Sequence, residues 1–434
     1  MNFQLILPLL VQTVVVISIR KIHNSWIHPG VFFPLLWLLY SIGPLLFASD
    51  YYIQPYGLWI ITLFISAVGL GSLLSTNAID EQATINKNFE NSFKDYKPVL
   101  FIAVFITSIF AFIGAGLVLG FTMNRFQLNF SIFNLLMLPN EISVDRYLEI
   151  LNYPIYIKFF RYWLFPASLL AGLAYPLARK IRESFLCFLP LIIAILFGLM
   201  ETSRFTIITT VVIWYAGVLG ARITLQENLN KFFDKRSKRF FLFASTLFVG
   251  LFILLDWLRQ AQGELVAYLV LERLKAYLFG YLAAFSNWVT MIHDGNIQFG
   301  QSTFAGPLSL TGIVERKFGS YGPILIAGDL STNIYTALRG LIMDFSILGT
   351  GMIMILIGWF GSITYQNVMR GKLFFLIPLT LFYAFTLYSP LISIFHYNSL
   401  IMSWVILAVF FLLAKPIVQN SWDKDGFTGI IFNQ

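Results

Sequence analysis

Apolar runs of about twenty residues recur along this chain, and they decide its fold class. A helix needs about 20 mainly apolar residues to cross a bilayer. Of the 434 residues, 58% are hydrophobic and only 12% are charged, whereas a soluble domain carries about 25% charged residues. The sequence therefore predicts an all-α polytopic membrane protein with about eleven transmembrane helices. The expected spans are 3–19, 31–48, 57–75, 98–121, 162–178, 184–200, 204–220, 240–258, 341–364, 373–389 and 399–415.

Positive charge predicts the orientation of these spans, because cytoplasmic loops carry an excess of Lys and Arg. Placing the basic loop 222–239 in the cytoplasm puts most of the 29 Lys and Arg residues on that side. The N-terminus is then outside, and 416–434 forms a short cytoplasmic tail. The first apolar run is followed, not preceded, by Arg20 and Lys21. A signal peptide has the opposite polarity, so we expect a retained first span.

Two long outer loops follow from this topology, at about 122–161 and 259–340. Both contain apolar-rich pieces that are too short or too polar to span, such as 265–291. We expect these pieces to be amphipathic or re-entrant helices at the membrane interface. The chain has no internal repeat, so residues 1–434 are expected to form a single transmembrane domain.

The outer side keeps arginines that the charge rule disfavours there. Arg204, Arg259 and Arg339 each lie at the end of a predicted span. A guanidinium binds phosphate oxygens bidentately, so these three are the candidate ligands of an anionic lipid headgroup, such as a polyprenyl diphosphate. Snorkelling of a helix-end arginine, or pairing with the nearby Glu201 or Asp256, is the structural alternative.

Asp344 and His396 are the candidate catalytic residues. Asp344 is expected about one turn inside the membrane, where a carboxylate is costly and indicates either function or a buried ion pair. His396 lies in a short outer loop, where a neutral imidazole can accept a proton. Sugar faces can stack on aromatic rings, and the candidates for this are Tyr277, Tyr281, Trp288, Tyr321, Tyr335 and Tyr397.

Several classes of site have no matching sequence pattern. The chain has one cysteine and four histidines, and no HExxH motif or Cys/His cluster. It also has no P-loop and no dinucleotide-binding fingerprint. We therefore expect no metal site and no cofactor, and we expect no nucleic-acid partner.

The 331–349 stretch resembles the "N-x-[YF]-T … DFG-x-x-G" passage of the bacterial O-antigen polymerases, the Wzy-type family of oligosaccharide repeat-unit polymerases. Ser346 stands where that family usually has glycine. The predicted span count and the large late outer loop are also similar to the family. The matching residues are Asn333, Tyr335, Thr336, Asp344, Phe345 and Gly349.

The resemblance implies a metal-independent, inverting glycosyltransferase of polysaccharide biosynthesis in the bacterial cell inner membrane. Its substrate would be an undecaprenyl-diphosphate-linked oligosaccharide, and its expected partners are membrane lipid and a chain-length-regulating co-polymerase. Two alternatives stay open. Arg204 with Ile208 is close to the Arg-x3-Leu of the related O-antigen ligases, with Ile in place of Leu, which supports Arg204 as a site residue and keeps a ligase-type transferase as an alternative. A non-enzymatic flippase or transporter would usually have an even span count with repeated halves.

Overall fold

The computed structural model describes residues 3–75, 93–127, 131, 142, 145, 152–201, 203–226, 246–247, 249–255, 267–291, 297–314 and 321–431, with side chains described as far as 418. Within these ranges the chain is mainly helical, and eight helices are long and apolar enough to cross a membrane. They are α1 (Phe3–His23), α2 (Pro29–Phe47), α3 (Pro55–Leu73), α5 (Lys97–Arg125), α9 (Ile181–Met200), α10 (Arg204–Thr224), α14 (Ala337–Met369) and α16 (Asn398–Ile431).

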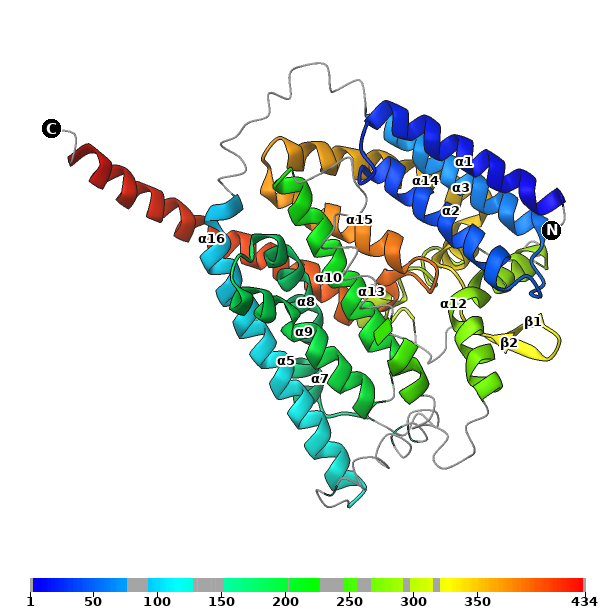
Figure 1. The fold of residues 1–434 in the computed structure, drawn as a ribbon, viewed down its shortest axis with the longest axis horizontal. Helices are drawn as coiled ribbons and strands as arrows, with labels where there is room; N and C mark the ends of the chain where they lie inside the picture. The colour runs from blue at the N-terminus through cyan, green and yellow to red at the C-terminus, as the bar shows by residue number, and fades with distance from the viewer. Residues whose placement is uncertain are drawn as a thin grey trace.

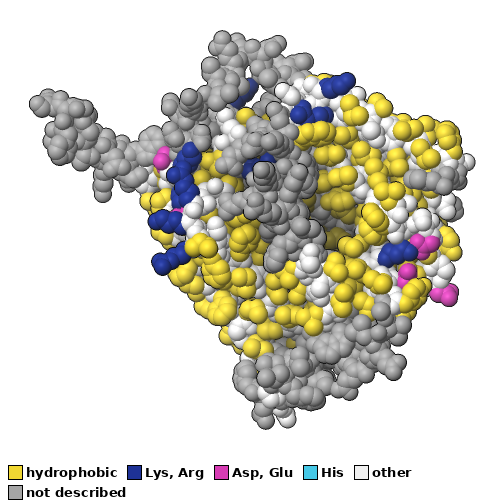
Figure 2. All heavy atoms as spheres, viewed as in Figure 1, with side chains coloured by type: hydrophobic (Ala, Val, Ile, Leu, Met, Phe, Trp, Pro, Cys, Tyr) yellow, Lys and Arg dark blue, Asp and Glu magenta, His cyan; other side chains and the backbone are white. Residues whose placement is uncertain are grey.

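The remaining elements are shorter or less apolar. They are α7 (Ile155–Tyr162), α8 (Leu164–Ala174), η2 (Tyr175–Leu177), α12 (Ala267–Thr290), α13 (Ala305–Leu310), β1 (Ile324–Ala327), β2 (Leu330–Thr332), η3 (Leu373–Phe375), α15 (Leu376–Tyr388) and η4 (Ile394–His396). Hydrophobic side chains cover most of the described face in Figure 2. The helical class is thus confirmed, with eight helices in the described residues that could cross a membrane. The count of eleven spans and their orientation stay predictions.

Two predicted spans differ from a single long helix. The 162–178 span is divided among α7, α8 and η2. The break between α7 and α8 follows from Pro166, which has no N–H to donate to the carbonyl of Tyr162. The 373–389 span is the 13-residue α15 preceded by the short η3. The 240–258 span lies partly outside the described residues. The predicted tail 416–434 begins as a continuation of α16, whose backbone is helical to Ile431.

The helices form two groups with three helices between them (Figure 1). In the first group, α1, α2, α3 and α14 pack on one another. In the second, α5, α7, α8 and α9 pack together. Helices α10, α15 and α16 connect the groups. Helices α10 and α16 both pack on α8 of the second group and on α15, and α15 packs on α2 and α14 of the first group.

Residues at the helix ends explain where several helices start. Helices α2 and α3 both have proline at their first position, where the missing N–H costs nothing. The Nδ1 atom of His28 accepts a hydrogen bond from the N–H of Gly30 at 3.2 Å and so caps α2. Glu183 accepts from the N–H of Arg179 at 2.7 Å at the start of α9, and it also pairs with Lys97 of α5 at 3.0 Å.

Small residues bring α3 and α14 into close contact. A Cβ on Gly71 would stand 1.9 Å from the carbonyl oxygen of Ile355, and one on Gly358 would stand 2.1 Å from that of Val68. Only glycine permits such backbone contact, which is a common way of packing helices in membranes. These contacts fix α14, whose first turns carry Arg339 and Asp344, against α3.

Helix α12 is held against α2 by a hydrogen bond that a proline makes necessary. Pro44 lies inside α2 and cannot donate to the carbonyl of Tyr40. The hydroxyl of Tyr281 donates to that carbonyl at 2.7 Å. The region of this helix was expected to be interfacial or re-entrant, and the structure places it against α2, α3 and the hairpin.

Helix α12 also meets the start of α3. The hydroxyl of Ser286 accepts from the N–H of Gln54 at 3.0 Å. A Cβ on Gly57 would stand 2.5 Å from the Cα of Ser286. The two helices can therefore lie this close only because position 57 has no side chain.

A short antiparallel hairpin, β1–β2, lies beside α12. The backbone N–H of Tyr52 donates to the carbonyl of Ile326 at 2.7 Å, and the Tyr52 hydroxyl accepts from the N–H of Gly328 at 3.1 Å. Asn287 of α12 donates to the carbonyl of Leu325 at 3.2 Å. These bonds fix the hairpin to the α2–α3 connection. Nothing in the sequence pattern predicts it.

Candidate functional site

Arg339 lies in a cage of three aromatic rings at the start of α14. Its guanidinium carbon is 4.8 Å from the ring centroid of Trp288, 4.1 Å from that of Tyr321 and 3.9 Å from that of Tyr335. Its Nε and Nη1 atoms are buried without a hydrogen-bond partner among the described residues. Within the same residues, no carboxylate forms an ion pair with it. The cage stabilises the cation through the ring faces and leaves donor groups uncommitted.

The two tyrosines of the cage are neutral hydrogen-bonding groups. Burial raises the pKa of Tyr321 to about 12, against the opposing influence of the Arg339 cation. Burial likewise raises the pKa of Tyr335, whose hydroxyl donates to the carbonyl of Gly322 at 3.0 Å. Their ring centroids are 5.4 Å apart. Three aromatics expected to stack on sugars therefore surround an arginine.

Asp344 is fully buried, and its carboxylate is occupied by backbone amides. One oxygen accepts from the N–H of Ser302 at 2.9 Å and the other from the N–H of Thr303 at 2.6 Å. Bonds of this kind to a carboxylate are charge-assisted and strong. Asp344 thus binds the 297–304 segment to α14, a structural role that differs from the catalytic role or ion pair expected from the sequence.

The same segment satisfies a break in α14. The helix is interrupted at Ser346, whose φ is 63° and ψ is 175°. A break of this kind removes the helical donors for the preceding carbonyls. The carbonyls of Met343 and Asp344 accept instead from the N–H groups of Gln298 and Phe299, each at 3.1 Å. A broken membrane helix is stable only where such groups find partners.

The conformation of Ser346 gives a physical reason for the glycine usually found in the motif that 331–349 resembles. This region of φ/ψ space is almost restricted to glycine, and another residue there stores about 1–3 kcal/mol of strain. The side chain of Ser346 offsets part of this backbone strain energy. Its Oγ accepts from the N–H of Gly349 at 3.4 Å, as an N-cap of the second half of the helix does.

The other motif residues lead into α14. Asn333 is exposed. Thr336 is the N-cap residue of α14 and is fully buried, but its side chain makes no capping hydrogen bond. The N–H of Ala337 donates to the carbonyl of Ser389 at 2.7 Å, which ties the start of α14 to the end of α15.

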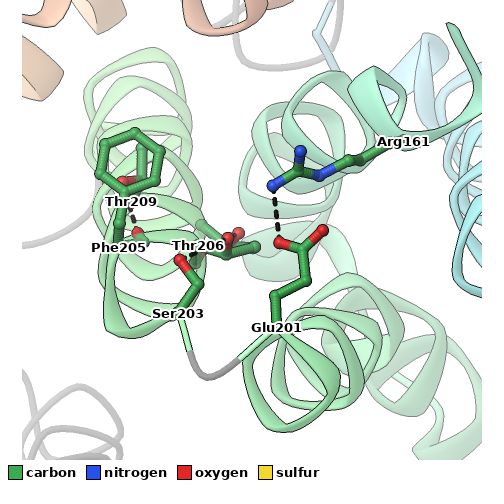
Figure 3. Close-up of polar contacts among 7 residues, drawn as sticks. Arg161, Glu201, Ser203, Phe205, Thr206 and Thr209 are labelled. Atoms are coloured by element: carbon green, nitrogen blue, oxygen red, sulfur yellow. Dashed lines mark hydrogen bonds and ion pairs between the residues drawn. The ribbon is translucent and has the colours of Figure 1, made fainter. Parts of the chain in front are cut away.

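Arg204 opens α10 beside two further aromatic rings. Its guanidinium carbon is 3.5 Å from the ring centroid of Phe252 and 5.7 Å from that of Tyr277. The nearby Glu201 forms an ion pair with Arg161 at 2.6 Å (Figure 3). Arg204 and Arg339 therefore share an environment, since each lies at the N-terminal start of a long apolar helix, against aromatic rings.

His396 lies in η4, on the loop that follows α15, and its side chain is buried. Its ring is 5.1 Å from that of Tyr397, which in turn is 4.5 Å from the ring of Phe205 at the start of α10. On the other side of the loop, the ring of Phe395 is 5.3 Å from that of Phe304, beside α13.

The predicted site residues thus come from segments each of which contacts the next. The start of α10 contacts the His396 loop, that loop contacts the 297–314 segment, and this segment is bonded to α14 at Asp344. Arg259, Asp256 and His293 lie outside the described residues. The described residues hold no group of three or more His, Cys, Asp or Glu able to bind a metal.

Sequence reasoning missed the residues that act through backbone or through small size. Ser302 and Thr303 appear in no motif, and Gly340 looks like an ordinary helix glycine.

No protein-family model, curated protein or solved structure matches this chain.

Proposed function

We propose that this chain is a membrane glycosyltransferase that polymerises undecaprenyl-diphosphate-linked oligosaccharide repeat units at the outer face of the bacterial inner membrane. The proposal combines three supports: the polytopic helical fold, the resemblance of the 331–349 stretch to O-antigen polymerases, and the environment of Arg339. The chain would cross the membrane about eleven times, with its N-terminus outside.

The environment of Arg339 is the observation that carries the proposal. A guanidinium that is half-buried at the start of an apolar helix, with donors that have no partner in the described chain, favours an anionic ligand at membrane depth. A diphosphate on a polyprenyl chain has that charge at that depth. Arg204 has a similar position and joins it as a second cation for the leaving diphosphate.

The chemistry needs no nucleotide, because the diphosphate is itself the leaving group. A hydroxyl of the acceptor sugar attacks the anomeric carbon of the growing chain. The bond from that carbon to the diphosphate oxygen breaks, and the diphosphate leaves with the electron pair. Positive side chains stabilise this developing charge, an effect for which the loss of one such donor costs about 100- to 1,000-fold in rate.

The proton of the attacking hydroxyl goes to a general base, and we assign this role to His396. Asp344 was the other candidate. Its two oxygens accept from Ser302 and Thr303 and it has no exposed surface, so it suits an anchoring role better than proton transfer. A buried imidazole near the start of α10 is a chemically suitable acceptor.

The test is a polymerisation assay with purified protein in proteoliposomes and an undecaprenyl-diphosphate-linked repeat unit. The native chain should yield a ladder of longer lipid-linked products. Arg339→Ala and Arg204→Ala should each lower the rate by at least about 100-fold. Arg273→Ala is the matched control, because Arg273 is an exposed arginine of α12, and it should leave the rate unchanged.

The products separate the proposal from its rivals. Transfer of sugar onto a lipid A core acceptor, without a longer undecaprenyl-linked chain, would identify a ligase. Movement of the repeat unit across the bilayer without any longer product would identify a flippase. Either result, or normal polymer from both arginine variants, would refute the polymerase assignment.

A further inference from the structure

Four buried polar atoms at the start of α14 have no hydrogen-bond partner in the part of the chain that the structure describes. They are Oγ1 of Thr303, Oγ1 of Thr336, and Nε and Nη1 of Arg339. Thr303 is 1% exposed and Thr336 is 0% exposed. Buried polar groups in proteins are nearly always hydrogen-bonded. Such exceptions, grouped at one place, favour a bound ligand that supplies the partner.

Three of the residues concerned lie at the start of α14. Arg339 and Gly340 are in its first turn, and Thr336 is the residue before it. A Cβ on Gly340 would stand 3.1 Å from the hydroxyl oxygen of Tyr321 and 3.5 Å from Oγ1 of Thr303. Glycine at position 340 therefore lets two hydroxyls approach the first turn of α14 closely, beside the guanidinium that contacts the Tyr321 ring.

The chemistry of the cluster selects its ligand. A guanidinium only donates hydrogen bonds, and hydroxyl groups donate readily. The start of a helix adds partial positive charge. The carboxylate of Asp344, on the same helix, has each oxygen engaged by a backbone N–H. A ligand that satisfies this set must accept several hydrogen bonds and carry negative charge, which describes an oxyanion.

We propose that the start of α14 is a phosphoryl-oxygen subsite, in which Thr303, Thr336 and Tyr321 donate to the oxygens that Arg339 neutralises. This inference rests on the proposed function, in which the ligand is one phosphate of undecaprenyl diphosphate. Asp344 is then a positioning residue, because its bond to the N–H of Thr303 fixes where that hydroxyl stands.

Thr303→Val tests the subsite by removing one hydroxyl at nearly constant shape. The hydroxyl has no partner in the described chain, so its loss should leave the melting temperature of the ligand-free protein unchanged or higher. The affinity for undecaprenyl diphosphate, measured by its stabilisation of the purified protein, should fall about tenfold. Thr303→Ser keeps the hydroxyl and should bind as the native chain does.

Gly340→Ala tests the placement of the two hydroxyls. The added methyl would stand 3.1 Å from the Tyr321 hydroxyl oxygen and 3.5 Å from Oγ1 of Thr303 and would displace these donors, so undecaprenyl diphosphate should bind at least about tenfold more weakly. Gly351→Ala is the matched control in the same helix, because a Cβ there meets no atom within 4 Å. It should bind normally. Unchanged binding in both Thr303→Val and Gly340→Ala would overturn the subsite, and so would a lower ligand-free melting temperature in Thr303→Val.

Two further probes identify the source of the oxyanion. Inorganic pyrophosphate that stabilises the native chain and loses its effect in Gly340→Ala would show a site for the phosphate alone. Stabilisation by the lipid form only would show that the polyprenyl chain is also needed. Both results support the subsite.

Binding and turnover fail separately. If the native chain binds undecaprenyl diphosphate through these residues but makes no polymer, the subsite stands and the polymerase function is refuted. If the native chain makes polymer, and the Thr303→Val and Gly340→Ala variants bind and turn over normally, the polymerase function stands and the subsite is refuted.

Discussion

The hydroxyl of Ser346 accepts a hydrogen bond from the backbone N–H of Gly349 at 3.4 Å, across the point where α14 breaks. The residue that interrupts the helix therefore also caps its second half. Its backbone has a positive φ of 63°, in a region that favours glycine. The strain and the cap act on stability in opposite directions, which makes them separable by substitution.

Ser346→Gly should raise the free energy of unfolding by about 0.5–1 kcal/mol, because strain of about 1–3 kcal/mol is relieved and the lost cap and added chain entropy return only part of it. Ser346→Ala keeps the strain and loses the cap, so it should be destabilised by about 1 kcal/mol. Thermal unfolding of the purified variants measures both. An alanine variant more stable than the glycine variant would contradict the strain argument.

Tyr281→Phe should lower the free energy of unfolding by about 1–2 kcal/mol, because it leaves the carbonyl of Tyr40 buried without a donor. Pro44→Ala restores the helical N–H that can reach that carbonyl. The double variant should therefore lose less stability than the sum of the two single variants, as a double-mutant cycle would measure. Strict additivity would mean that Tyr281 does not substitute for the missing donor.

Arg161→Ala should cost more stability than Glu201→Gln. The Glu201 side chain is 4% exposed, whereas that of Arg161 is 29% exposed. Removing the arginine leaves a buried carboxylate, which costs about 3–5 kcal/mol. Removing the carboxylate charge leaves an arginine that water can reach, at about 1 kcal/mol. Unfolding curves of the two variants give the order, and a reversed order would show that this burial difference does not govern the pair.

The stability of the protein should decrease as the pH falls below about 6.5, in part because of His28. Burial first, and then the neighbouring His23, hold the pKa of His28 well below its ordinary value of 6.5. The unfolded state then binds a proton that the folded state does not, so stability is complete above pH 6.5 and declines below it, by at most about 1.4 kcal/mol per pH unit for one proton.

His28→Asn isolates this contribution. Asparagine keeps an acceptor for the N–H of Gly30 at the start of α2 but does not titrate. Melting temperatures measured between pH 5 and pH 8 should show a shallower decline for the variant than for the native chain. Parallel curves would exclude His28 as a source of the pH dependence.

The long apolar runs were sufficient to predict the helical membrane class and the position of eight long helices, because about twenty consecutive apolar residues have few other stable states. Helix length was less predictable. The division of the 162–178 region depends on Pro166 and on packing against neighbours. Hydropathy averages over a window and does not register a single missing N–H.

The candidate site was predictable only in part. Arg204 and Arg339 were selected as candidates because cations on a predicted outer side run against a known bias. The aromatic cage of Arg339 was not predictable, because its rings come from three separate segments and Trp288 is 51 residues away from Arg339 in sequence. The anchoring of Thr303 by Asp344 uses a backbone amide, and a backbone amide has no sequence pattern.

The contact between Gly57 and Ser286 has a consequence for where loss-of-function substitutions will occur. Any side chain at position 57 pushes against the backbone of α12, and α12 carries Trp288, one wall of the Arg339 cage. A mutation in the first turn of α3 is therefore expected to appear as a defect at the proposed ligand site rather than in membrane insertion. A genetic screen would group it with substitutions in the Arg339 cage, although it lies on another helix.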